Sequence, residues 1–144
     1  MQITIYRGAH EIGGTLVELK SGKSRIFIDA GYPLFLNNQP IEDEVFTYAP
    51  EKLLELGVLP DIKGLYAWDT PTLEAVIISH AHIDHYWLLK YVHPDIPVYL
   101  SVGTHKIIEI SQMFKLISPI LSGSRTFEMY KPFHLKMLED AKRQ

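Results

Sequence analysis

The stretch "SHAHIDHYW", residues 79–87, decides how this sequence is interpreted. Within six positions it places three histidines and one aspartate: His80, His82, Asp84 and His85. It closes a short continuous apolar run, "LEAVIISH" (residues 73–80), which is typical of a strand buried on both faces. Folds of the α/β class commonly place ligand sites where such a strand ends.

The spacing of these four residues predicts metal binding. In an extended segment, residues two apart point to the same side, so His80 and His82 can converge on one ion. Asp84 and His85 follow as the chain turns into a predicted helix, and they can face a second ion. The alternative is a polar loop with chance histidines, but four ligand-type residues in six positions favour a metal site.

The residue types limit which metals fit. The chain has no cysteine, so any metal must bind to His, Asp or Glu. Imidazole combined with carboxylate suits one or two Zn²⁺ ions, with Mn²⁺ as the alternative. Four isolated histidines are interpreted as surface, capping or core residues and not as ligands: His10, His93, His105 and His134.

Strands and helices are predicted on both sides of the motif. Alternating or continuous apolar runs predict strands at 2–7, 15–20, 25–31, 73–80, 95–101 and 125–130. The first three form an antiparallel meander. Helices are predicted at 50–57, 85–92, 104–118 and 135–144. Strands that precede helices after an antiparallel start indicate an α/β sandwich with the helices outside the sheets.

Two groups of apolar residues are assigned to the core. In the helix at 104–118, which Pro119 would end, one face carries Ile107, Ile110, Phe114 and Ile117 and is predicted to pack inward. The long segment 32–72 carries aromatic residues that either anchor this loop or line a substrate cleft, and anchoring is favoured: Phe35, Phe46, Tyr48, Tyr66 and Trp68.

Length and composition set the broad class. A chain of 144 residues, 47% apolar and 22% charged, is expected to be a single globular domain, 1–144. The first residues lack the apolar region of a signal peptide, and no run is long enough for a membrane span, so a cytoplasmic protein is expected. A net charge of -3 provides no global attraction to nucleic acid.

The motif also carries a family resemblance. "SHAHIDH" (79–85) resembles the HxHxDH motif of the metallo-β-lactamase-fold hydrolases. The opening "YRGAHEIGGTLVELKSGKSRIFIDAG" (6–31) and the later "HPDIPVYLS" (93–101) resemble the ribonuclease J-like, nucleic-acid-processing branch. The resemblance implies an αββα sandwich, of which this chain would supply the N-terminal half to two-thirds. It also implies phosphodiester hydrolysis of RNA or DNA by metal-bound hydroxide.

The resemblance assigns a role to each residue. His80 and His82 would bind the first metal, and Asp84 and His85 the second. Asp84 would also hold the bridging hydroxide in position, as the catalytic residue. Asp29, at the end of an early strand, would steady the histidine loop without binding metal; taken alone, it reads as an ordinary turn residue.

The family pattern breaks near the end of the sequence. "KPFHLK" (131–136) is followed by "MLEDAKRQ", where a "DHS"-like segment with the third histidine is expected; His134 comes too early and Asp140 lacks the matching context. The chain is therefore expected to carry half of a dinuclear site and to have little activity alone. A second copy or a partner chain could complete the site. The sequence is also compatible with a non-catalytic metal-binding module, and with a lactamase or thioesterase of the same fold.

Overall fold

The computed structural model describes residues 1–10, 13–117 and 127–130, with the strand at 127–130 described by its backbone. The predicted helix at 135–144, together with His134 and Asp140, lies outside the described residues. In the part of the chain that the structure describes, no helix is both long enough and apolar enough to cross a membrane.

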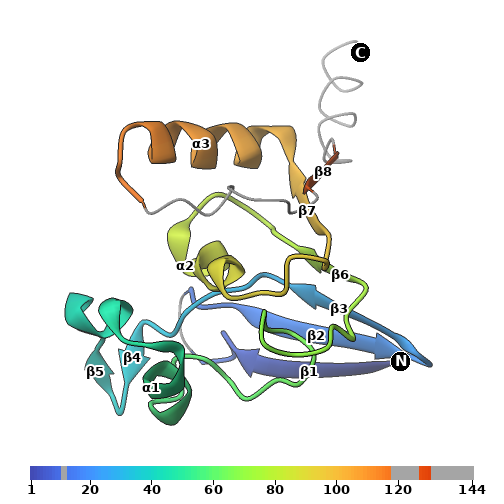
Figure 1. The fold of residues 1–144 in the computed structure, drawn as a ribbon, viewed down its shortest axis with the longest axis horizontal. Helices are drawn as coiled ribbons and strands as arrows, with labels where there is room; N and C mark the ends of the chain where they lie inside the picture. Colours follow the sequence, from blue (N-terminus) through green and yellow to red (C-terminus); the bar gives the residue numbers. More distant parts are fainter. Residues whose placement is uncertain (11–12, 118–126, 131–144) are drawn as a thin grey trace.

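One mixed sheet organises the molecule (Figure 1). Its strand order is β1-β2-β3-β6-β7-β8. The first three strands pair antiparallel, as the sequence predicts, and β3, β6, β7 and β8 pair parallel. Their bounds are Gln2–Arg7 for β1, Leu16–Ser21 for β2, Ser24–Ile28 for β3, Ala75–Ile77 for β6, Val98–Ser101 for β7 and Phe127–Tyr130 for β8.

The segment between β3 and β6 contains short elements only. A small hairpin joins β4 (Phe35–Leu36) to β5 (Gln39–Pro40) through two asparagines with left-handed backbone, as a two-residue hairpin turn requires. A 3₁₀ helix, η1 (Asp43–Thr47), and the predicted α1 (Pro50–Glu55) follow. Pro50 begins α1 and Gly57, in left-handed conformation, lies just beyond its end.

The helix predicted at 85–92 is shorter and differently placed. The α-helix α2 covers Ile83–Tyr86, and a 3₁₀ helix, η2, continues over Trp87–Lys90. The backbone N–H of Leu88 donates to the carbonyl of Ala30 at 2.9 Å instead of to a carbonyl within α2. This contact with the end of β3 explains why regular α-helix stops after one turn.

The helix α3 differs from the prediction, which placed one apolar face of the 104–118 helix in the core. It covers Val102–Met113, because the Ser101 hydroxyl accepts a hydrogen bond from the Thr104 N–H and caps it early. It ends well before Pro119. Thr104 and Ile108 form its buried side, whereas Ile107, Ile110 and Phe114 are exposed, Phe114 by 73%. The prediction that these three pack inward is wrong; Ile117, beyond the helix, does pack partly against the core.

The hydrophobic core lies on one face of the sheet. Phe27, Val76 and Leu100 point from the strands toward α2, η2, α3 and the 50–66 segment. These covering elements contribute fully buried side chains of their own: Leu53 from α1, Leu88 from η2 and Ile108 from α3. The aromatic residues of the 32–72 segment fall into a buried group and an exposed group. Tyr66 is buried and Phe46 and Tyr48 pack against the core, which confirms anchoring for these three, but Phe35 and Trp68 are about half exposed.

The opposite face of the sheet is apolar as well. The registers Ile3↔Leu19, Ile5↔Val17, Leu19↔Ile26 and Ile28↔Ile77 place a continuous set of aliphatic side chains on one side. None of them is fully buried, and Ile3 is 57% exposed. We call this set the bare face: Ile3, Ile5, Val17, Leu19, Ile26, Ile28 and Ile77. A sheet that is apolar on both sides is suited to the middle of a sandwich.

The bare face predicts binding of a fluorescent dye that reports exposed apolar surface. The chain should enhance the fluorescence of anilinonaphthalene sulfonate, and the double substitution Ile3→Lys with Ile5→Lys should lower that signal by roughly half, since contiguous exposed apolar surface is what the dye binds. Gln2→Lys, on the same strand but the other face, is the control. Equal dye binding by all three proteins, with unchanged circular dichroism, would contradict this use of the face.

Candidate metal centre

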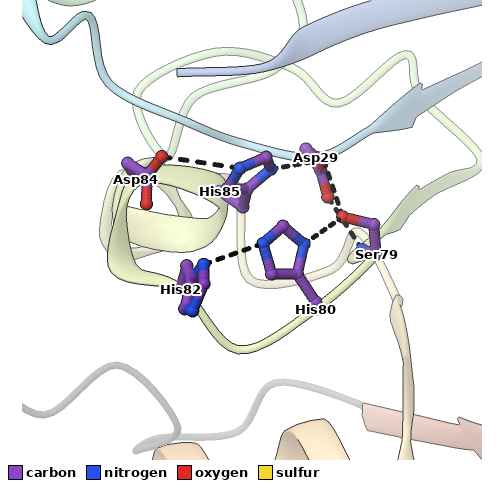
Figure 2. A network of polar contacts seen from close by, with 6 residues as sticks. All are labelled: Asp29, Ser79, His80, His82, Asp84 and His85. Carbon is purple, nitrogen blue, oxygen red and sulfur yellow. Dashed lines mark hydrogen bonds and ion pairs between the residues drawn. The ribbon is translucent and has the colours of Figure 1, made fainter. Parts of the chain in front are cut away.

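The histidine loop lies at the carboxyl end of β6 and runs into α2. His82 is extended and caps α2, whose first turn contains Asp84 and His85. The parallel register Ile28↔Ile77 brings the end of β3 beside the end of β6, so Asp29 and Ser79 emerge next to each other. All four motif residues and Asp29 therefore gather at one edge of the sheet (Figure 2).

Asp29 holds the loop through three hydrogen bonds. Its Oδ1 accepts from the Ser79 N–H at 2.7 Å, and its Oδ2 accepts from the Ser79 hydroxyl at 2.9 Å and from His85 Nδ1 at 2.8 Å. The residue is only 2% exposed and has a left-handed backbone, φ 60°, which Asp tolerates better than most residues. The geometry is that of a positioning residue.

These bonds determine which ring nitrogens can bind a cation. A carboxylate only accepts, so His85 Nδ1 carries a proton and its Nε2 keeps a lone pair in the neutral ring. The single proton of the Ser79 hydroxyl goes to Asp29, so the hydroxyl oxygen accepts from His80 Nδ1, 2.9 Å away. His80 then also presents Nε2 with a free lone pair.

The first pair of ligand atoms is His80 Nε2 and His82 Nδ1, which are 3.1 Å apart. Two nitrogens that bind one zinc ion at about 2.0–2.1 Å in tetrahedral geometry are separated by about 3.3 Å. The observed separation fits a shared ion closely. Without an ion, a proton on His82 Nδ1 would make the same contact a hydrogen bond.

The second pair is His85 Nε2 and Asp84 Oδ2, which are 3.4 Å apart. When the His85 ring is neutral, its Nε2 and the Asp84 Oδ2 are both hydrogen-bond acceptors. Their approach is therefore unfavourable unless a proton or a cation lies between them. The rings of His80 and His85 are adjacent, with centroids 4.0 Å apart, so the two pairs are neighbours. The geometry therefore offers two adjoining places for a cation.

Within residues 1–10, 13–117 and 127–130, each place has two ligands. Among the described residues, no group of three or more His, Asp or Glu side chains is arranged to hold a metal ion. His10, on an exposed loop, and His93, whose Nδ1 accepts from the Asp95 N–H at 3.2 Å, do not join the cluster. Two protein ligands are fewer than the three or four of ordinary zinc sites.

Neighbouring charges act on His80. Burial lowers its pKa below the usual value, and the nearby His85 and His82 lower it further, whereas Asp29 and Asp84 oppose the shift. A lowered pKa keeps the imidazole neutral at neutral pH. The neutral form is the one that binds a metal ion.

Sequence reasoning missed three residues of this site. It gave Ser79 no role, although it directly precedes the motif. It also assigned none to Gly13 and Gly31. A Cβ on Gly13 would lie 2.0 Å from Asp84 Oδ2, and one on Gly31 would lie 2.1 Å from the Asp84 carbonyl oxygen. These glycines leave the space that Asp84 occupies. The sequence signals that could have indicated them are the "GG" turn at 13–14 and the "DAG" strand end at 29–31.

Replacing Asp29 is expected to destabilise the fold. Asp29→Ala should lower the free energy of unfolding by about 2–4 kcal/mol, because the three hydrogen bonds from Ser79 and His85 to the buried carboxylate are lost. Asp29→Asn tolerates the same backbone and should lose less. Asp61→Asn, at an exposed position, should change little. Denaturant unfolding measures all three, and equal stability of Asp29→Ala and Asp61→Asn would contradict the anchoring role.

The sequence is similar to curated proteins of two kinds. It is 24% identical over 140 residues to the transcription termination factor FttA of Thermococcus kodakarensis, across 94% of this chain and 19% of the relative. It is 43% identical over 60 residues to ribonuclease J of Sinorhizobium meliloti, across 40% of this chain and 10% of the relative. The chain thus spans about a fifth of the length of FttA and a tenth of ribonuclease J. No family profile matches it.

Solved structures share the fold. A protein of unknown function from Enterococcus faecalis V583 is 26% identical with a TM-score of 0.62, covering 90% of this chain and 33% of that one. A Thermotoga maritima protein assigned to the metallo-β-lactamases has a TM-score of 0.51 at 18% identity, covering 90% of this chain and 58% of that one. The chain therefore has part of the metallo-β-lactamase fold, and its sequence is similar to those of ribonuclease J and the FttA factors.

Proposed function

We propose that the histidine loop is one half of a two-metal hydrolytic centre that cleaves phosphodiester bonds in nucleic acid. The observation that carries this proposal is the pair of close contacts, His80 with His82 and His85 with Asp84, each at a separation that one ion spans. Zn²⁺, as one or two ions, is the proposed metal, and Mn²⁺ is the alternative.

The chain's own residues prepare this centre. Bound divalent ions would acidify water and neutralise the charge that develops on phosphoryl oxygens. Asp29, directly and through Ser79, keeps a proton on the Nδ1 atoms of His85 and His80 and so turns their Nε2 lone pairs outward. The Asp84 carboxylate adds the negative charge that a second cation needs. We propose that it also orients the attacking nucleophile.

The names of the relatives support the substrate class. Ribonuclease J is named for its action on RNA, and FttA for transcription termination. We therefore propose nucleic acid as the substrate, RNA ahead of DNA. A chromogenic lactam and a thioester, assayed beside a phosphodiester, test whether the same fold instead serves as a lactamase or a thioesterase.

A second proposal concerns what completes the centre. Two ligands per ion and an apolar bare face both favour completion by polypeptide outside these residues, from a longer protein, a partner chain or a second copy. Packing a second sheet on the bare face would bury its aliphatic side chains. A non-catalytic module that holds a single structural ion is the contrasting proposal. Tight uptake of one ion that stabilises the chain without turnover would favour it.

Metal uptake tests the centre directly. Calorimetric titration of metal-stripped protein with Zn²⁺ and with Mn²⁺ should detect binding that His82→Ala weakens at least about tenfold and Ser79→Ala weakens less, since Ser79 acts through His80. His93→Ala is the matched control, because His93 lies outside the cluster. If the unsubstituted protein takes up neither ion, the proposed centre is wrong.

Hydrolysis by this chain alone should be weak. Turnover of bis(p-nitrophenyl) phosphate with added Zn²⁺ or Mn²⁺ is expected to stay near the background of the metal alone, because the residues that the structure describes offer each ion only two ligands. Sedimentation equilibrium should accompany the assay to give the oligomeric state. Robust turnover by a monomer, lost in His82→Ala, would mean that these residues hold a complete centre.

A further inference from the structure

A cavity beside the histidine loop has no role in the centre described above. Its volume is about 310 Å³, at the small end of ligand pockets. Besides residues 116–117, it is lined by Tyr32, Asp43, Phe46, Ile83, Trp87 and Lys90. We call this cavity the aromatic pocket.

The aromatic pocket adjoins the proposed metal centre. Ile83, in its wall, lies between His82 and Asp84 in the chain. Tyr32 follows Gly31, where a Cβ would collide with the Asp84 carbonyl oxygen. Burial raises the pKa of Tyr32, and the negative charges of Asp84 and Asp43 raise it further, so the phenol lies within the field of both carboxylates. A group bound in the pocket would therefore be next to a group bound at the histidine loop.

Three mutually packed rings form the apolar part of the pocket. The centroids of Tyr32 and Phe46 are 4.7 Å apart, those of Phe46 and Trp87 are 5.1 Å apart, and those of Tyr32 and Trp87 are 5.6 Å apart, all edge to face. Such walls offer dispersion and quadrupole contacts to another planar ring. Aromatic side chains beside basic ones are how proteins hold single-stranded nucleic acid.

Two exposed charges of opposite sign complete the lining. Lys90 Nζ lies 3.9 Å from the centre of the Trp87 ring, and the Asp43 carboxylate belongs to η1 on the other segment of the wall. Neither side chain forms a hydrogen bond or an ion pair with another described residue. The pocket therefore presents one cation and one acceptor that remain available to a ligand.

We propose that the aromatic pocket binds one nucleobase of a single-stranded nucleic acid, beside the bond that the metal centre would cleave. The rings contact the base, and Lys90 neutralises the phosphate of the same nucleotide. The Asp43 carboxylate accepts a hydrogen bond from an exocyclic amino group of the base. Cytosine, adenine and guanine carry such a group, whereas uracil does not. The pocket therefore prefers amino-bearing bases. This inference rests on the proposed function for its substrate class.

Mononucleotides test the pocket without any metal. Trp87 and Trp68 are the two tryptophans of the chain, so a Trp68→Phe background makes the fluorescence report on the pocket wall. Titration with CMP should change this fluorescence saturably, and UMP should bind about tenfold more weakly, because uracil would place its O4 carbonyl oxygen against the Asp43 carboxylate where cytosine places its amino group. Isothermal calorimetry on the protein with both tryptophans supplies a readout independent of the fluorophore.

Two substitutions separate the charges of the pocket. Lys90→Met should weaken CMP and UMP alike, by at least about fivefold, through the lost phosphate contact. Asp43→Ala should remove the preference for CMP over UMP. Lys52→Met is the matched control, because Lys52 lies on α1, pairs with Glu55 and does not line the pocket. Circular dichroism checks that each variant is folded.

Several outcomes would overturn the inference. They are no saturable response to either nucleotide, ribose 5-phosphate binding as tightly as CMP, or equal effects of Lys90→Met and Lys52→Met. Failure of the metal proposal remains distinguishable. His82→Ala should weaken metal uptake at least about tenfold but leave CMP binding unchanged. An unsubstituted protein that takes up metal yet does not bind CMP would count against the aromatic pocket alone.

Discussion

The carboxylate of Asp29 is the contact on which the site depends. It is buried, and its three hydrogen bonds join the ends of two strands and the start of a helix: β3 through its own backbone, β6 through Ser79 and α2 through His85. The backbone repeats the connection, since Ala30 donates to the His85 carbonyl and Leu88 donates to the Ala30 carbonyl. A buried charge is stable only with such partners, so the site and the local fold form together.

The same carboxylate links structure to chemistry through proton positions. An imidazole can bind a metal only through a nitrogen that carries no proton, and an isolated histidine exchanges its proton between both nitrogens. Here Asp29 acts on His85 directly and on His80 through the Ser79 hydroxyl, so both rings carry the proton on Nδ1. One side chain thus orients two histidines, one before α2 and one within it. An alanine at this position would remove orientation as well as hydrogen bonds.

Local pattern was sufficient for much of the fold and part of the site. The period-two spacing of His80 and His82 predicted that their nitrogens approach each other, and alternation predicted the meander, because both depend on residues close in sequence. The position of Ser79 and the space beside Gly13 depend on contacts about 50 and 71 residues distant in the chain, which no local pattern encodes. The inward stripe on α3 failed because the register of that helix is set by the Ser101 cap and by Ile108 against the sheet.

The bare face and the two-ligand geometry are related features. An antiparallel sheet commonly places its apolar residues on one covered face, yet here β2 and β3 carry apolar residues on both. Covering the second face with another sheet would bring new loops to the sheet edge that holds Asp29 and the histidines, because that edge bounds both faces. The same additional polypeptide could therefore both cover the bare face and supply the missing ligands of the metal centre. An ion held by residues from both sides would in turn stabilise the packing of the two sheets, since metal binding to the assembled state alone shifts the equilibrium toward it.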